Sequence, residues 1–199
     1  MMKNLFQILC GLFLVVSYSS CMHSEEDKVD VLIIGGGASG VTSGIQSARM
    51  GANTLILEES TWLGGMLTSA GVSAVDGNYR LPAGLWGEFK NRLSDYYGGL
   101  DSLKTGWVSN VLFEPSVGNK ILHEMVAAEN NLKVWKQACL EEVKRTGDEW
   151  VAKVKVEGQG VKTVRAKVMI DATELGDVAK MCGVKYDIGM EKIGRASCR

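Results

Sequence analysis

The sequence has few prolines and histidines and no excess of charge of either sign. Its 199 residues include 2 Pro and 2 His, and 22 Lys and Arg oppose 23 Asp and Glu, for a formal net charge of -1. Without a basic excess the chain lacks the electrostatic footprint of a nucleic-acid-binding protein, so we expect no nucleic acid as partner. A hydrophobic content of 46% excludes a disordered or collagen-like chain. The composition predicts a globular protein with enough chain for a core.

The five cysteines do not form a metal-binding pattern. No two of them have the C-x-x-C spacing, so the sequence offers no ligand set for zinc or for an iron–sulfur cluster. Cys10, Cys21 and Cys198 lie near the ends of the chain. Cys139 and Cys182 remain in its central part, which is too few for a disulfide scaffold. We expect Cys182 to be a small buried side chain.

The first 20 residues have the pattern of a secretory signal peptide. Lys3 precedes an apolar run over 5–16, which is shorter than the ~20 residues that a membrane-spanning helix needs. The segment resembles a bacterial lipoprotein signal with Cys21 at the position that is acylated. Tyr18 stands where such signals usually carry an aliphatic residue, so cleavage without lipidation stays an alternative.

The stretch after Cys21 is acidic. Its residues 24–27 are similar to the tract that follows the lipidated cysteine in surface-displayed lipoproteins of Bacteroidetes, and a simple acidic tether over 22–28 is the alternative. The resemblance implies a lipid-anchored protein of the cell envelope, with the membrane as a partner. At the other end, residues 193–199 (IGRASCR) match the translation of a common sequencing adapter. We therefore expect the natural sequence to differ after about residue 192.

Residues 29–58 have the pattern of a β-α-β unit. The run 29–34 (VDVLII) is almost wholly aliphatic, which predicts a strand buried on both faces of a parallel sheet. A helix is predicted over 38–50, because apolar residues recur on one face, and Gly51 ends it. A second aliphatic strand, 54–57, leads to Glu58. The apolar face of the predicted helix consists of Val41, Ile45, Ala48 and Ala52.

The rest of the central part contains helices and an antiparallel meander. Helices are expected near 85–97 and 116–130, with a strand over 132–135 between the second helix and the meander. Alternating residues predict three meander strands at 140–144, 150–156 and 161–170. Two sets of residues are each expected to share a face: Trp150, Ala152, Val154 and Val156, and then Val164, Ala166, Val168 and Ile170.

The loop after the first strand carries the spacing Gly35-x-Gly37-x-x-Gly40. Between a buried strand and a helix, Gly35 permits a tight turn, Gly37 lets backbone approach a diphosphate, and Gly40 allows close packing of helix on strand. Ala38 and Ser39 belong to the N-terminus of the helix, whose unpaired N–H groups favour a diphosphate. The loop is therefore a candidate dinucleotide site.

Glu58 follows the last glycine of this loop by 18 positions. A carboxylate at this point is placed to accept hydrogen bonds from the ribose hydroxyls, and it repels a 2′-phosphate, which disfavours NADP. Strand alternation predicts that Glu59 points elsewhere.

A second glycine pair, Gly64 and Gly65, follows soon after. The chain here resembles the FAD-dependent oxidoreductase family of two-dinucleotide-binding-domain flavoproteins, most closely its heterodisulfide-reductase A-like members and Bacteroidetes lipoproteins. The matching pieces are VDVLIIGGGASGVTSGIQSARMGANTLILEES, WLGGMLTSAG and VMIDATELGDVAKMCGVKYDIGME. The resemblance implies non-covalent FAD, with Gly64 and Gly65 near it, Ala172 and Thr173 beside it and Leu140 near the adenine. Gly176 and Asp177 would form the next turn. This chain has Glu174 where many relatives have glycine.

We therefore expect an α/β fold with a Rossmann-like FAD-binding domain over 29–192, in which a parallel sheet lies in a three-layer ββα arrangement with the meander. Family members are several hundred residues long, so we expect an N-terminal fragment, inactive alone, whose substrate domain is largely missing. The predicted function is FAD-dependent oxidation or reduction of a small-molecule substrate, with no catalytic residue assigned. The alternatives are an NAD-linked dehydrogenase and a non-catalytic surface lipoprotein that keeps the fold as a binding module. Some relatives carry a 4Fe-4S cluster, for which this sequence has no ligands.

Overall fold

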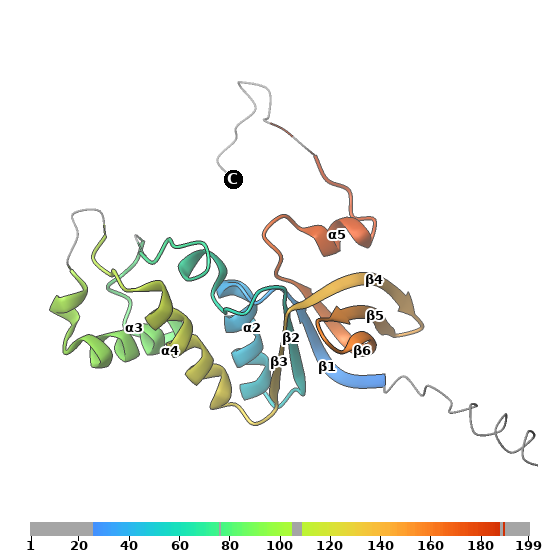
Figure 1. Cartoon of the computed structure of the whole chain (residues 1–199), viewed down its shortest axis with the longest axis horizontal. Helices are drawn as coiled ribbons and strands as arrows, with labels where there is room; N and C mark the ends of the chain where they lie inside the picture. Colours follow the sequence, from blue (N-terminus) through green and yellow to red (C-terminus); the bar gives the residue numbers. More distant parts are fainter. Residues whose placement is uncertain (1–25, 76, 105–108, 188, 190–199) are drawn as a thin grey trace, which may run out of the picture.

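The computed structural model describes residues 26–75, 77–104, 109–187 and 189, and in them one six-stranded sheet with the strand order β3-β2-β1-β6-β5-β4 (Figure 1). Strands β3, β2, β1 and β6 run parallel, whereas β6, β5 and β4 form an antiparallel meander. The predicted α/β class, a parallel sheet with a meander, is confirmed. The strands are β1 (Glu26–Ile34), β2 (Thr54–Glu58), β3 (Leu132–Lys136), β4 (Ala138–Thr146), β5 (Glu149–Val156) and β6 (Gly160–Asp171).

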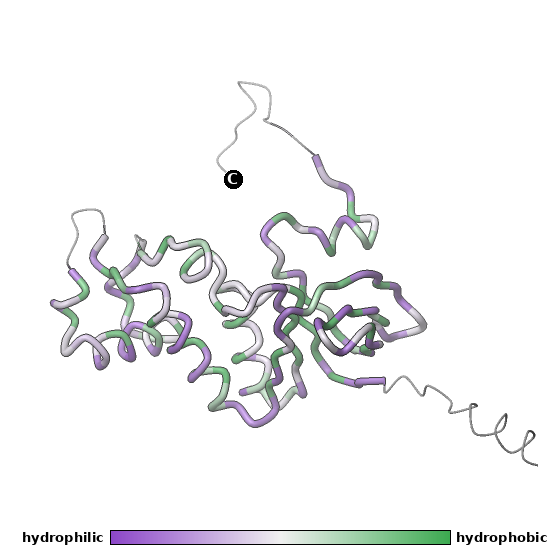
Figure 2. Tube along the Cα trace, in the orientation of Figure 1, coloured by the Kyte–Doolittle hydropathy of each residue, from purple (hydrophilic) through white to green (hydrophobic). Residues whose placement is uncertain are grey.

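Helices cover one face of the parallel strands, and the meander covers the other. On the helix side Ile33 and Ile56 pack in one core with Val41 and Ile45, and on the meander side Leu32 and Leu55 pack with residues of β5. Figure 2 shows apolar and polar residues alternating along α4, as expected for a helix with one buried side. The helices are α2 (Ala38–Arg49), α3 (Gly84–Tyr97), α4 (Pro115–Ala127) and α5 (Asp177–Met181), with the short 3-10 helices η1 (Gly65–Leu67) and η2 (Leu100–Leu103).

Strand β6 belongs to both parts of the sheet, and its two faces change sides along its length. Ala166 is buried in the core on the meander side, but Val168 is 51% exposed and Ile170 packs on the helix side, so the prediction of one shared face for 164, 166, 168 and 170 is wrong. The neighbouring strand changes sides at the same level, because the N–H groups of Asp30 and Val31 both donate to the carbonyl of Asn53, at 2.8 and 3.2 Å. Two successive donors on one acceptor interrupt the simple alternation of the strand.

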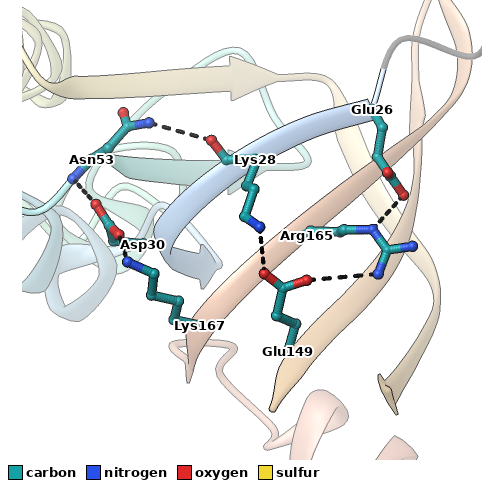
Figure 3. Close-up of polar contacts among 7 residues, drawn as sticks. All are labelled: Glu26, Lys28, Asp30, Asn53, Glu149, Arg165 and Lys167. Atoms are coloured by element: carbon teal, nitrogen blue, oxygen red, sulfur yellow. Dashed lines mark hydrogen bonds and ion pairs between the residues drawn. The ribbon is translucent and has the colours of Figure 1, made fainter. Parts of the chain in front are cut away.

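Strand β1 begins at Glu26, so the tether predicted over 22–28 is wrong for residues 26–28. These residues pair with β6, beginning with Glu26 opposite Thr163. Ion pairs hold their side chains across the strands: Lys28 lies 2.7 Å from Glu149, and Arg165 lies 2.6 Å from Glu26 (Figure 3). Residues 26–28 are charged and show no run of aliphatic residues, which is why the sequence did not predict this part of the strand.

The remaining boundaries agree with the predicted ones to within three residues. The predicted signal peptide (1–20), the lipidation candidate Cys21 and the adapter-like segment 193–199 lie outside the described residues. In the part of the chain that the structure describes, no helix combines the length and the apolar character needed to cross a bilayer.

Candidate cofactor-binding site

The glycine loop connects β1 to α2, and two of its glycines are required by neighbouring backbone. A Cβ on Gly35, which has φ +102°, would lie 2.5 Å from the carbonyl oxygen of Ala172, and a Cβ on Gly40 would lie 1.8 Å from that of Gly35. Gly37 differs, because no protein atom lies within 4 Å of its Cβ position. The loop is therefore closed on the sheet side and open to solvent at Gly37.

The second glycine pair lies directly against this loop. The N–H of Gly64 donates to the carbonyl of Gly36 at 2.8 Å, and a Cβ on Gly65 would lie 3.1 Å from the Cα of Gly37. Gly64 has φ +108° and its Cβ position is only 2.6 Å from a side-chain carbon of Leu122. Two segments that are far apart in the sequence thus form one surface of bare backbone, which allows a ligand to approach closely.

Glu58 is fixed by backbone donors at the end of β2. Its Oε2 accepts a hydrogen bond from Gly36 N at 2.8 Å, and its Oε1 accepts one from Ser60 N at 2.7 Å. Each carboxylate oxygen keeps a second lone pair as an acceptor. Glu59 lines the cleft at the carboxyl ends of β1, β2 and β6, with its Oε1 3.3 Å from Cys139 Sγ. The prediction that it points elsewhere is therefore wrong. The reason is that β2 ends at Glu58, and strand alternation does not extend to the next residue.

The carboxyl ends of β1, β2 and β6 surround a cleft with a volume of about 320 Å³. It brings together seven of the predicted site residues, Gly35, Gly37, Glu58, Gly65, Leu140, Ala172 and Thr173. Ala38 and Ser39 are exposed on the first turn of α2, next to the cleft, and Gly40 and Gly64 are buried behind its wall. The cleft is where ligands bind in open α/β sheets.

Asp171 organises the turn from β6 to α5, and sequence reasoning missed it. Its Oδ1 accepts hydrogen bonds from Thr173 N and Thr173 Oγ1, at 3.0 and 2.6 Å, and its Oδ2 accepts one from Ala179 N at 2.8 Å. Burial opposes ionisation, but these hydrogen bonds outweigh it and lower the pKa of Asp171. An Asp at the end of a strand, followed two residues later by Thr, is the signal that could have indicated this turn. Asp171 therefore positions the wall of the cleft that carries Thr173.

Other candidate side chains lie away from the cleft or lack reactive surroundings. Cys182 is exposed, not buried as predicted, because α5 is short and buries only Val178. Burial and the neighbouring Glu59 raise the pKa of the Cys139 thiol, which keeps it protonated. His123 on α4 is half-buried, and burial lowers its pKa. No group of three or more His, Cys, Asp or Glu in the described ranges is arranged to hold a metal ion.

The sheet order, the paired glycine segments and the carboxylate at the end of β2 define a dinucleotide-binding domain. The chain belongs to the family of FAD dependent oxidoreductases, whose model matches residues 30–197. No curated protein matches it in sequence.

Solved structures share this fold at low sequence identity. A flavoprotein/dehydrogenase from Cytophaga hutchinsonii is 18% identical with a TM-score of 0.61, over 83% of this chain and 44% of that one. An anhydrotetracycline hydroxylase from Streptomyces rimosus is 15% identical with a TM-score of 0.56, over 78% and 34% of the two chains. A geranylgeranyl bacteriochlorophyll reductase-like protein from Thermoplasma acidophilum is 20% identical with a TM-score of 0.53, over 80% and 43%. The chain thus spans less than half the length of each of these structures.

Proposed function

We propose that this chain is the FAD-binding part of an oxidoreductase that acts on a small molecule at the cell envelope. The observation that carries the proposal is the cleft itself: Gly37 is open to it, Gly65 meets Gly37 from a second segment, and Glu58 lines it with a carboxylate held by Gly36. An elongated dinucleotide fits such a site, since its diphosphate needs bare backbone and its ribose needs a fixed acceptor. The similarity to heterodisulfide-reductase A-like proteins supports the same assignment.

The chain's own residues would hold the two ends of the cofactor differently. Helix α2 starts at Ala38 with no side-chain cap and no acidic residue in its first turn, so its N–H groups and positive end are free for the diphosphate. Glu58, held by Gly36 and Ser60, would accept from the ribose hydroxyls. Leu140 offers an apolar wall for the adenine. FAD, when bound, would supply hydride or electron-pair transfer.

We also propose that a lipid on Cys21 anchors the protein to the membrane. The basic start, the short apolar run and the cysteine that follows small residues support this location.

An absorption spectrum of the purified protein tests the cofactor. We expect the bands of oxidised flavin, and we expect denaturation to release FAD, because the site holds it without a covalent bond. The matched control is Gly37→Val, which fills the open side of the loop and should lose the flavin while the far-ultraviolet circular dichroism stays unchanged. A protein that carries NAD and no flavin would overturn the proposal in favour of the NAD-linked dehydrogenase.

A further inference from the structure

Carboxylates line the cofactor cleft, and no Lys, Arg or His occurs among its described lining residues. The four acidic residues are Glu58, Glu59, Glu174 and Asp177. A ligand with a doubly charged diphosphate would normally be matched by cationic side chains or by backbone donors. Here only the backbone and the end of α2 provide positive potential, so each carboxylate near the diphosphate opposes binding.

Besides Glu58, Glu174 also places a carboxylate beside the paired glycine segments. Its Oε1 lies 3.8 Å from the Cβ position of Gly65, and that position lies 3.1 Å from the Cα of Gly37. Glu58 is engaged by Gly36 and Ser60, and Glu59 lies beside Cys139. By contrast, no hydrogen bond or ion pair within the described residues neutralises or orients the Glu174 side chain, which is exposed. Its charge is therefore directed at the mouth of the loop and is not compensated there.

We propose that Glu174 sets the cofactor affinity of this cleft, as a negative charge that opposes the diphosphate and keeps the flavin exchangeable. This inference rests on the proposed function, because it concerns the same site and takes FAD as its ligand. Two unit charges about 6 Å apart change a dissociation constant about threefold in bulk water and about a hundredfold at an effective dielectric constant of about 20. For an exposed carboxylate we expect an effect between these limits, on the order of tenfold. The positive end of α2 attracts the diphosphate, and Glu174 reduces that attraction.

Equilibrium dialysis of the flavin-free protein against FAD measures this effect without any enzymatic assay. We expect Glu174→Gln, which keeps the shape of the side chain and removes its charge, to lower the Kd for FAD about tenfold. Glu174→Asp keeps the charge and should stay within about threefold of the wild type. Asp148→Asn removes one charge from the exposed β4–β5 turn, outside the cleft, and should leave the Kd unchanged.

Ionic strength provides a second readout. The difference between wild type and Glu174→Gln should shrink as salt rises towards 1 M, where the Debye length is about 3 Å. An unchanged Kd in Glu174→Gln would overturn the inference. A higher Kd would also overturn it, because it would make Glu174 a hydrogen-bond acceptor for the cofactor. If neither the wild type nor any variant binds FAD, or if all bind NAD instead, the proposed function itself fails.

Discussion

Two glycines of the loop after β1 have different expected roles, Gly40 in the stability of the fold and Gly37 in the binding of FAD. A methyl group would meet different surroundings at each. On Gly40 it would lie 1.8 Å from a backbone oxygen, whereas on Gly37 it would meet no protein atom within 4 Å. We expect Gly40→Ala to lower the free energy of unfolding by about 1–3 kcal/mol, by forcing α2 away from the strand. Gly37→Ala should cost less than about 1 kcal/mol, yet weaken FAD binding. Denaturant unfolding and FAD titration of both variants check this, and equal stabilities would contradict it.

Through the carboxylate of Asp171, the stability of the turn from β6 to α5 is expected to depend on pH. Its pKa is lowered in the folded protein, so its contribution to stability is present above its unfolded pKa and is lost as pH falls through the folded pKa. Asp171→Asn removes the acceptor for Ala179 N, and we expect it to cost about 1–2 kcal/mol at neutral pH. In denaturant unfolding, the difference between variant and wild type should decrease on acidification below the folded pKa. A difference independent of pH would contradict this account.

At the scale of elements, Arg49 joins three helices. From the end of α2 its guanidinium donates to both oxygens of Glu88 on α3, at 2.6 and 2.8 Å, and to Glu129 just after α4, at 2.7 Å. These bonds raise the pKa of Arg49 and lower that of Glu88. We expect Arg49→Ala to cost about 1–2 kcal/mol and Arg49→Lys somewhat less, because an ammonium cannot make the paired contact with Glu88. A double-mutant cycle with Glu88→Gln should give a coupling energy above about 0.5 kcal/mol, and additive losses would contradict the linkage.

The helices and strands themselves can be predicted from the periodicity of apolar residues. Which face of a strand is buried, and where the strand begins, depend on the strands that pack beside it. The aliphatic run 29–34 and the glycine spacing were sufficient for β1 and the cofactor loop, since burial on both faces selects such residues. Residues 26–28 join the strand through ion pairs across β5 and β6, which no local pattern contains. Val168 is exposed because β6 follows β1, which changes sides where Asp30 and Val31 share the carbonyl of Asn53. The pairing of Val31 with Val168 that transmits this change spans more than a hundred residues. The acidic lining at Glu59 and Glu174 likewise required the assembled cleft.

For the whole molecule, the start of the domain and the cofactor cleft lie at opposite ends of β1. The strand runs nine residues from Glu26 to Ile34 (Figure 1), and the glycine loop that follows it lines the cleft. At about 3.3 Å per residue the two ends are roughly 26 Å apart. An anchor at Cys21, five positions before Glu26, reaches at most about 18 Å from the strand. In a lipid-anchored protein the cleft would therefore lie at the end of β1 opposite the anchor, beyond the reach of the tether.

Phase partitioning tests the anchor independently of the flavin. If Cys21 carries more than one acyl chain, the wild-type protein from its native membrane should enter the detergent phase, because two chains hold a protein stably where one is marginal. Cys21→Ser should move to the aqueous phase while its flavin content per protein stays the same, since the cleft lies at the other end of β1. Cys182→Ser, which changes an exposed cysteine of the folded domain, is the matched control and should partition like the wild type. A wild-type protein in the aqueous phase would contradict stable lipid anchoring and favour cleavage without lipidation, the alternative that Tyr18 leaves open, and it would leave the cofactor assignment standing.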